Sequence, residues 1–174
     1  MLDIAVAYNK YKFLGYEFLT WLWFSIDTDQ QQLFEGMDGD SLLQIGNRMV
    51  LERGLEDAVE KITIKGDDAG LEEGMMALKK GAMVTEVHLS YRKDGLTWSF
   101  NIKGESLNLS SLKLPETGVL ENKEDAEGVV LERIYMYEQI IGAVTAFFNR
   151  FINLRLSDTW ETTHVQQIKK WIAA

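Results

Sequence analysis

The chain has 174 residues, of which 46% are hydrophobic and 26% charged, an ordinary composition for one soluble globular domain that excludes global disorder. It contains no cysteine, which excludes disulfide frameworks, cysteine-ligated zinc, iron–sulfur clusters and thiol catalysis. With 18 basic against 27 acidic residues the net charge is −9, so any phosphate-binding surface has to be a local cluster of cations.

The chain opens with an N-terminal segment over residues 1–12 that lacks the basic start of a secretory signal. Residues 13–26 (FLGYEFLTWLWFSI) are apolar on nearly every side and predict a buried helix. The run is too short to cross a hydrocarbon core of roughly 30 Å, so we expect a cytoplasmic protein with no membrane partner. Alternatively, Trp21 and Trp23 form a dimer contact, because aromatic side chains are enriched in interface cores.

Turn signals divide the next part of the chain. Residues 27–40 are polar and acidic and predict a loop. Residues 42–52 predict a hairpin that turns at Gly46-Asn47, and residues 58–65 predict a further strand. A helix is expected over residues 69–80, with Asp67 or Asp68 as its N-cap and Gly81 as its C-terminal stop.

The strongest local pattern is a second hairpin over residues 83–103, which turns at Asp94-Gly95. Pairing across this turn places Tyr91 opposite Trp98 and puts three apolar pairs, six residues in all, on one face. The other face is wholly polar and pairs Arg92 with Thr97. A slip of one residue would destroy this separation, so the register is well specified. We expect one face on a core and the other in water or against a polar partner.

The C-terminal part is expected to be helical from residue 124 to residue 174. A short strand or edge segment ending at Pro115 and an exposed loop over residues 116–125 precede it. The long helix then has an apolar seam at heptad spacing, and we expect Ile134, Ile141 and Phe148 in an oligomer interface. A last helix is expected from about Asp158 or Thr159 to the end, with Ser157 or Asp158 as its N-cap. The seam comprises Val130, Ile134, Tyr137, Ile141, Val144, Phe148 and Phe151.

The order of elements predicts a single α+β domain over residues 1–174. Its antiparallel sheet is built from two hairpins plus one strand, and it packs with an N-terminal helix, a central helix and two C-terminal helices. No alternation of strand and helix of the parallel kind is present.

Motifs for catalysis are weak. His88 falls on the polar hairpin face, and neither it nor His164 accompanies a nucleophile motif. The turn after residue 65 has a strand–turn–helix context, but Asp67 and Asp68 would repel a phosphate there. The acids of residues 35–40 lack calcium-loop spacing. We therefore expect no enzyme activity, catalytic residue, metal, cofactor or small-molecule substrate; a carboxylate-dependent hydrolase stays open as an alternative.

The best cluster of cations belongs to the second hairpin and the helix end before it. Residues 61–113 hold 8 basic and 7 acidic residues, whereas the rest of the chain is acidic. Cations beside serine and asparagine on a strand face are typical of a surface that contacts a nucleic-acid backbone. A merely solvated strand face is the alternative. The candidate residues are Lys79, Lys80, Arg92, Lys93 and Lys103.

The segment over residues 79–114 resembles the C-terminal part of the bacterial recombination-associated protein RdgC family. The likeness lies in a helix ending at Gly81, a Val84-Thr85 strand, a strand with Trp98 and Phe100, and a closing Leu112-Lys113-Leu114. FLGYEFLTWLWF and the following NRMVLE are also similar to shorter RdgC-like proteins, so the likeness extends loosely over residues 13–156 and is best over residues 60–114.

This resemblance implies a non-enzymatic, nucleoid-associated protein that binds double-stranded DNA without sequence specificity, with a role in DNA recombination or replication. It also implies a homodimer, because family members form ring-shaped dimers around duplex DNA. The alternative is an acidic protein–protein interaction module that kept the fold without DNA binding.

Overall fold

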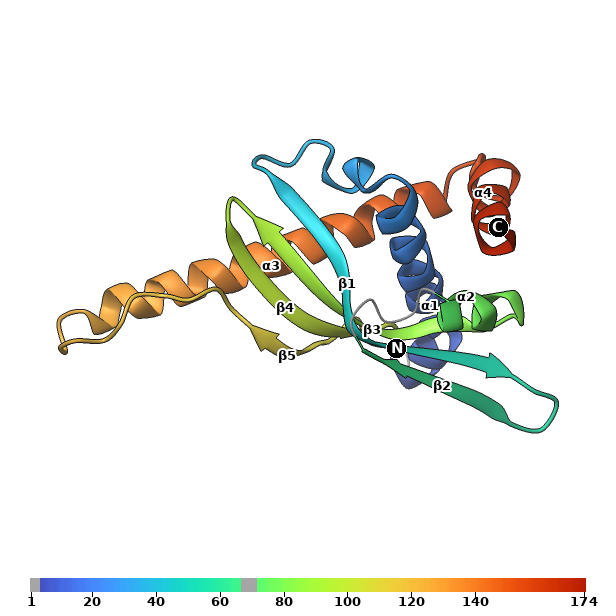
Figure 1. Cartoon of the computed structure of the whole chain (residues 1–174), viewed down its shortest axis with the longest axis horizontal. Coiled ribbons are helices and arrows are strands. Elements are labelled where there is room, and N and C mark those ends of the chain that lie inside the picture. Colours follow the sequence, from blue (N-terminus) through green and yellow to red (C-terminus); the bar gives the residue numbers. More distant parts are fainter. Residues whose placement is uncertain (1–3, 67–71) are drawn as a thin grey trace.

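The computed structural model describes residues 4–66 and 72–174, and side chains from residue 11 onward in the first helix. Four helices and a five-stranded sheet make up an α+β fold, as predicted (Figure 1). The helices are α1 (Ile4–Thr28), α2 (Glu72–Lys79), α3 (Ala126–Arg155) and α4 (Val165–Ala173), with a 3-10 helix η1 (Gln30–Phe34) and a π-helical turn η2 (Trp160–His164). The strands are β1 (Ser41–Gly54), β2 (Val59–Lys65), β3 (Met83–Lys93), β4 (Leu96–Lys103) and β5 (Leu109–Lys113).

The sheet is antiparallel throughout and has the strand order β2-β1-β3-β4-β5. The predicted β3–β4 hairpin is confirmed in its register, with Tyr91 opposite Trp98 and Arg92 opposite Thr97. Asp94 and Gly95 both have positive φ angles, of 50° and 82°, as a tight two-residue hairpin turn requires. The apolar partners of this hairpin are almost fully buried, so its two faces differ as the sequence pattern indicates.

The hairpin predicted around Gly46-Asn47 is wrong. Residues 41–54 form one continuous strand, β1, whose pairing with β3 is irregular between Ile45 and Met49. The true turn between β1 and β2 lies farther on, where the Leu55 N–H donates to the Ala58 carbonyl at 2.8 Å. Glycine marks a strand bulge as well as a turn, and the long pairing with β3 decides between the two here.

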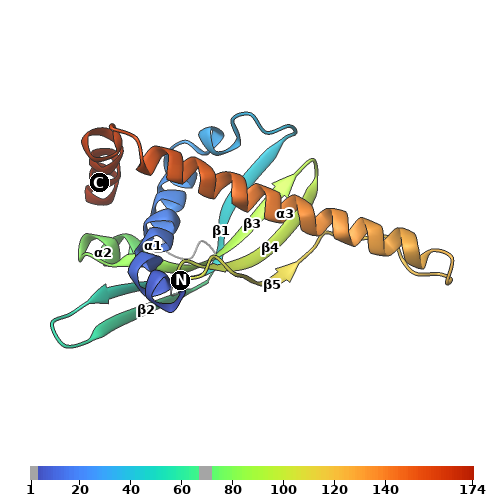
Figure 2. The same ribbon diagram turned by 180° about the vertical axis from the view of Figure 1, so that it is seen from behind.

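Helices α1 and α3 pack on the apolar inner face of the sheet, and α3 passes across it behind the strands in Figure 1 and before them in Figure 2. The Trp98 indole N–H donates to the Met136 carbonyl at 2.9 Å and joins β4 to α3. Thr20 accepts a hydrogen bond from the Val84 N–H at 3.2 Å and joins α1 to β3. These contacts fix both helices to the same side of the sheet.

Helix α1 is longer than predicted, since residues 4–12, expected to be a separate segment, belong to it. Trp21 and Trp23 are only 4% and 3% exposed. Trp21 lies against Phe151 at 5.7 Å between ring centroids, and Trp23 lies against Trp171 at 5.2 Å. Both indoles therefore pack in the interior of the chain, where a second chain cannot reach them, and the expected dimer contact at these residues is corrected.

Helix α2 ends where the sequence predicts. Gly81 has a φ of +87°, its N–H donates to the Leu78 carbonyl at 2.9 Å, and the Ala82 N–H donates to the Ala77 carbonyl at 3.0 Å. This pair of bonds is a Schellman motif, which favours glycine at the left-handed position. The predicted N-caps Asp67 and Asp68 lie outside the described residues.

Helix α3 buries a face that is shifted from the predicted seam. Its buried residues are Val129, Met136, Ile140, Ala143, Phe147 and Phe151. Only the C-terminal half crosses the sheet, while the N-terminal half extends beyond it with residues 114–125 running alongside (Figures 1 and 2). A straight helix of 3.6 residues per turn drifts away from a 3.5-residue seam, so the seam residues of the first half face outward.

The last helical part begins with η2 instead of a regular turn. Trp160 is buried against Phe151 at 5.7 Å between ring centroids, and Arg155 lies over the Trp160 ring at 5.6 Å. Helix α4 follows, and its Trp171 lies against Trp23 and Phe24 of α1. Within the described residues no helix combines the length and apolar character that crossing a bilayer requires.

The close approach of α1 to the turn after β4 gives a stability prediction. A Cβ atom on Gly15 would lie 1.6 Å from the Gly104 carbonyl oxygen, and backbone atoms cannot rotate away. We expect Gly15→Ala to lower the free energy of unfolding by about 2–3 kcal/mol, measured by urea denaturation. The matched control is Gly142→Ala in α3, where no atom lies within 4 Å, and it should stabilise by roughly 0.5–1 kcal/mol. Equal effects of the two substitutions would contradict this packing.

Candidate nucleic-acid interface

The outer face of the sheet, opposite α1 and α3, carries a lattice of polar side chains fixed by strand register and interrupted by Leu42 and Val50 of β1. One row runs from Gln44 through Ser90 and Ser99 to Lys113. The next row pairs His88 with Asn101 and Asn101 with Ser110. Neighbouring strands lie about 4.8 Å apart and alternate residues about 7 Å apart, so these rows bring side chains from β1, β3, β4 and β5 together.

Cations concentrate on this outer face. It has six cations and two acids, so it holds four net positive charges on a chain whose total is −9. Arg48 forms an ion pair with Glu86, and in the described part of the chain the other five cations make no ion pair. The cations are Arg48, Lys61, Lys65, Arg92, Lys103 and Lys113, and the acids are Glu52 and Glu86.

The five cations that the sequence predicts to contact a nucleic-acid backbone do not all lie on one surface of the structure. Arg92 and Lys103 lie on the outer face, about 20 Å apart along β3 and β4. Lys93 points the other way, toward α3, where its ammonium donates to the Gln139 side chain at 3.4 Å. Lys79 and Lys80 are exposed at the end of α2, before the start of β3, whereas Arg92 lies near the far end of that strand. Two of the five therefore share the outer face.

Sequence reasoning missed four outer-face cations. Arg48 was assigned to a hairpin, although it lies in the continuous strand β1 and thereby faces the same side as Lys65 of β2. Lys61 shares that side of β2, and Lys113 joins the face through the pairing of β5 with β4. Alternation of lysine with apolar residues in residues 59–65 was the signal available for β2.

His88 lies at the centre of the face, over the irregular part of β1. A Cβ atom on Gly46 would lie 1.9 Å from His88 Nδ1, so the missing side chain of Gly46 makes room for the imidazole. The Asn47 N–H donates to Nδ1 at 3.3 Å. Burial lowers the pKa of His88 below 6.5, and the nearby Lys113 ammonium lowers it further. Since Nδ1 accepts the hydrogen bond from Asn47, the neutral tautomer that fits the geometry has its proton on Nε2.

The described strands present no phenylalanine, tyrosine or tryptophan ring on the outer face for base stacking. The aromatic residues of the strands are Tyr91, Trp98 and Phe100, and each is at most 1% exposed on the inner face. Proteins that bind single strands combine cations with aromatic rings on which bases stack. Cations with hydroxyl and amide groups suit contact with phosphates instead.

A second surface feature is an apolar ridge along the first half of α3, formed by Val130, Ile134, Tyr137 and Ile141. These side chains are between 39% and 54% exposed. Ile134 and Ile141, expected in an oligomer interface, thus lie on the surface. Phe148 is different, because its ring packs against Phe18 at 5.3 Å between centroids and is half-buried.

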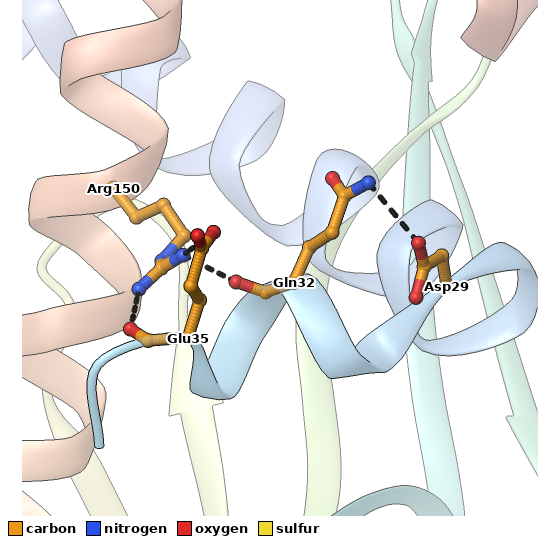
Figure 3. Close-up of polar contacts among 4 residues, drawn as sticks. All are labelled: Asp29, Gln32, Glu35 and Arg150. Atoms are coloured by element: carbon orange, nitrogen blue, oxygen red, sulfur yellow. Dashed lines mark hydrogen bonds and ion pairs between the residues drawn. The ribbon is translucent and has the colours of Figure 1, made fainter.

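A cleft of about 580 Å³ lies on the opposite side of the molecule from the lattice, between α1, η1, α3 and α4. Arg150 forms one wall, where its guanidinium donates to the Gln32 and Glu35 carbonyls and lies 3.6 Å from the Glu35 carboxylate (Figure 3). The Gln32 amide in turn donates to Asp29 at 3.0 Å. The polar groups of this wall therefore bind each other and hold η1 against α3.

Comparison with known proteins gave no relative: no protein-family model, curated protein or solved structure matches the chain. The resemblance to the RdgC family thus remains a prediction from the residues named above.

The Arg150 contacts predict how η1 is held. Arg150→Gln should lower the free energy of unfolding by about 1–2 kcal/mol, because two backbone carbonyls lose a charged donor. Limited proteolysis should then cleave faster within residues 29–40. Arg133→Gln, an exposed arginine of the same helix, is the control and should leave the cleavage pattern unchanged. Equal cleavage of the two variants would show that Arg150 does not hold this segment.

Proposed function

We propose that the chain is a non-enzymatic protein that contacts the phosphate backbone of double-stranded DNA, without reading base sequence, through the outer face of its sheet. The supporting observation is the concentration of six cations on that face of an otherwise acidic chain. Local positive potential draws a polyanion even when the whole protein is negative. The absence of aromatic rings from the outer side of the strands favours a duplex over a single strand.

The spacing of the cations fits a backbone. From Lys65 on β2 to Lys113 on β5 the face spans four strand spacings, about 19 Å. One DNA strand presents a phosphate about every 3.4 Å along the helix axis, so this width corresponds to roughly five phosphates. Half-buried Ser90, Ser99 and Asn101 lie between the cations and add uncharged donors. Such contacts position a duplex and do not depend on its sequence.

A role in DNA recombination or replication, and a place in the cytoplasm, belong to the same proposal and come from the resemblance to the RdgC family. The chemistry needs no cofactor, since contact with phosphates alone is sufficient for binding.

Salt dependence tests the proposal. The logarithm of the duplex affinity should fall with the logarithm of salt concentration with a slope of up to about −5, near 0.9 for each neutralised phosphate. Replacing Arg92 and Lys103 together with alanine should flatten the slope by about 1.8 and weaken binding at low salt. Fluorescence anisotropy with a short duplex across a salt series measures both quantities.

The matched control is the double substitution Lys79→Ala and Lys80→Ala, which removes the same charge from the end of α2, away from the outer face. It should leave the slope within error of the wild-type value. Absence of duplex binding at low salt, or equal effects of the two double variants, would overturn the proposed interface.

A second candidate function, favoured by the apolar ridge, is protein–protein association. Apolar side chains grouped on an exposed helix face mark interaction sites more often than scattered ones do. We propose a homodimer formed through this ridge, which would also double the number of phosphates contacted. An interaction module that binds no DNA is the alternative, and it predicts association through the ridge with no duplex affinity at any salt concentration.

Charge placed on the ridge tests the association. Ile134→Glu combined with Ile141→Glu should convert a dimer into a monomer, because carboxylates cannot be buried unpaired in an apolar contact. Sedimentation equilibrium measures the mass. Leu156→Glu is the control, since Leu156 is 79% exposed at the far end of α3 and should not affect association. A wild-type monomer at all concentrations would contradict the dimer.

A further inference from the structure

Three strands supply hydrogen-bond donors to one point on the outer face, around His88. Asn101 lies directly opposite His88 on β4, and Ser99, one row away, lies opposite Lys113 of β5. Lys113 belongs to the neighbouring row on β5, and its charge contributes to the lowered pKa of His88. The four groups thus enclose one spot above the middle of the sheet.

The imidazole is held in one orientation. The Asn47 N–H of β1 donates a hydrogen bond to Nδ1. The missing side chain of Gly46 lets the ring lie close to β1. Nδ1 is consequently the acceptor, and Nε2–H is left as a free donor. This arrangement explains why β1 is irregular at this place, since a regular strand with a side chain at position 46 would collide with the ring.

The donors at this spot lack acceptors. Within the described residues, the side chains of Ser99, Asn101 and Lys113 form no hydrogen bond or ion pair with another protein group, and each keeps its donors for an external ligand. Other charges lie near the ring on three strands. Glu86, two residues along β3, is paired with Arg48 of β1, and Lys103 of β4 lies beside it.

We propose that His88, Ser99, Asn101 and Lys113 form a seat for one phosphate of the DNA backbone. This inference rests on the proposed function and assigns the central contact of that interface. The phosphodiester oxygens would accept hydrogen bonds from His88 Nε2–H, the Asn101 amide, the Ser99 hydroxyl and the Lys113 ammonium. An ammonium and neutral donors around one anion are the usual composition of a phosphate site.

A phosphate in this seat changes the protonation of His88. Its negative charge offsets the Lys113 ammonium and favours the imidazolium, whose proton on Nδ1 replaces the hydrogen bond from the Asn47 N–H, so the pKa of His88 rises when DNA binds. By linkage, binding then takes up protons, and the affinity rises as the pH falls from about 8 to about 6. If DNA binding raises the His88 pKa by one unit, the duplex affinity rises about tenfold at pH values well below the His88 pKa of the free protein.

The experiment is an NMR titration of the two histidine rings of the full chain, with and without a saturating short duplex. We expect the His88 pKa to rise and the ring signals of His164 to stay unmoved when the duplex is added at fixed pH, because His164 lies in η2, in the cleft away from this face. Lys113→Gln should raise the His88 pKa in the free protein. In His88→Gln, duplex affinity should lose its dependence on pH and keep most of its dependence on salt.

The possible outcomes distinguish a failure of the phosphate seat from a failure of the proposed DNA-binding function. Duplex binding with the expected salt slope but an unchanged His88 pKa would overturn the seat and leave the sheet interface standing. No duplex binding at low salt would overturn both. A wild-type affinity that is equal at pH 6 and pH 8 would also count against the seat.

Discussion

The register of the β3–β4 hairpin is the constraint on which both faces of this protein depend. Because Asp94 and Gly95 adopt the two positive φ angles of a tight turn, Tyr91 meets Trp98 and Ser90 meets Ser99. The first pair lies in the core against α3, and the second lies on the outer face. A change of register by one residue would exchange them and would remove the core and the interface together.

Packing on the inner face leaves the outer face open for binding. Trp98 and Thr20 fix α3 and α1 to the same side of the sheet, so the polar lattice stays uncovered by those helices. The outer face, which we propose as the interface, is therefore supported from behind by a close-packed aromatic core. Rigid strands hold donors more precisely than loops do, and such rigidity suits repeated contact with a regular backbone.

Sequence patterns predicted the local parts of the structure and missed those set by distant pairing. The β3–β4 register and the stop at Gly81 follow from turn chemistry and alternation within a few residues. Gly46-Asn47 has the same turn chemistry, but its glycine serves to admit His88 from another strand, which no local pattern reveals. Likewise, the membership of Lys113 in the outer face depends on the irregular pairing of β5 with β4.

The most direct test is to add duplex DNA and map which backbone amide signals change their NMR chemical shift. This measurement locates the contact without altering a residue. The account predicts shifts concentrated in β3, β4 and β5 around Ser90, Ser99 and Asn101, which diminish as salt is added. Helices α2 and α4 should be unaffected. Shifts centred on the ridge of α3 or on the end of α2, with none on these strands, would contradict it.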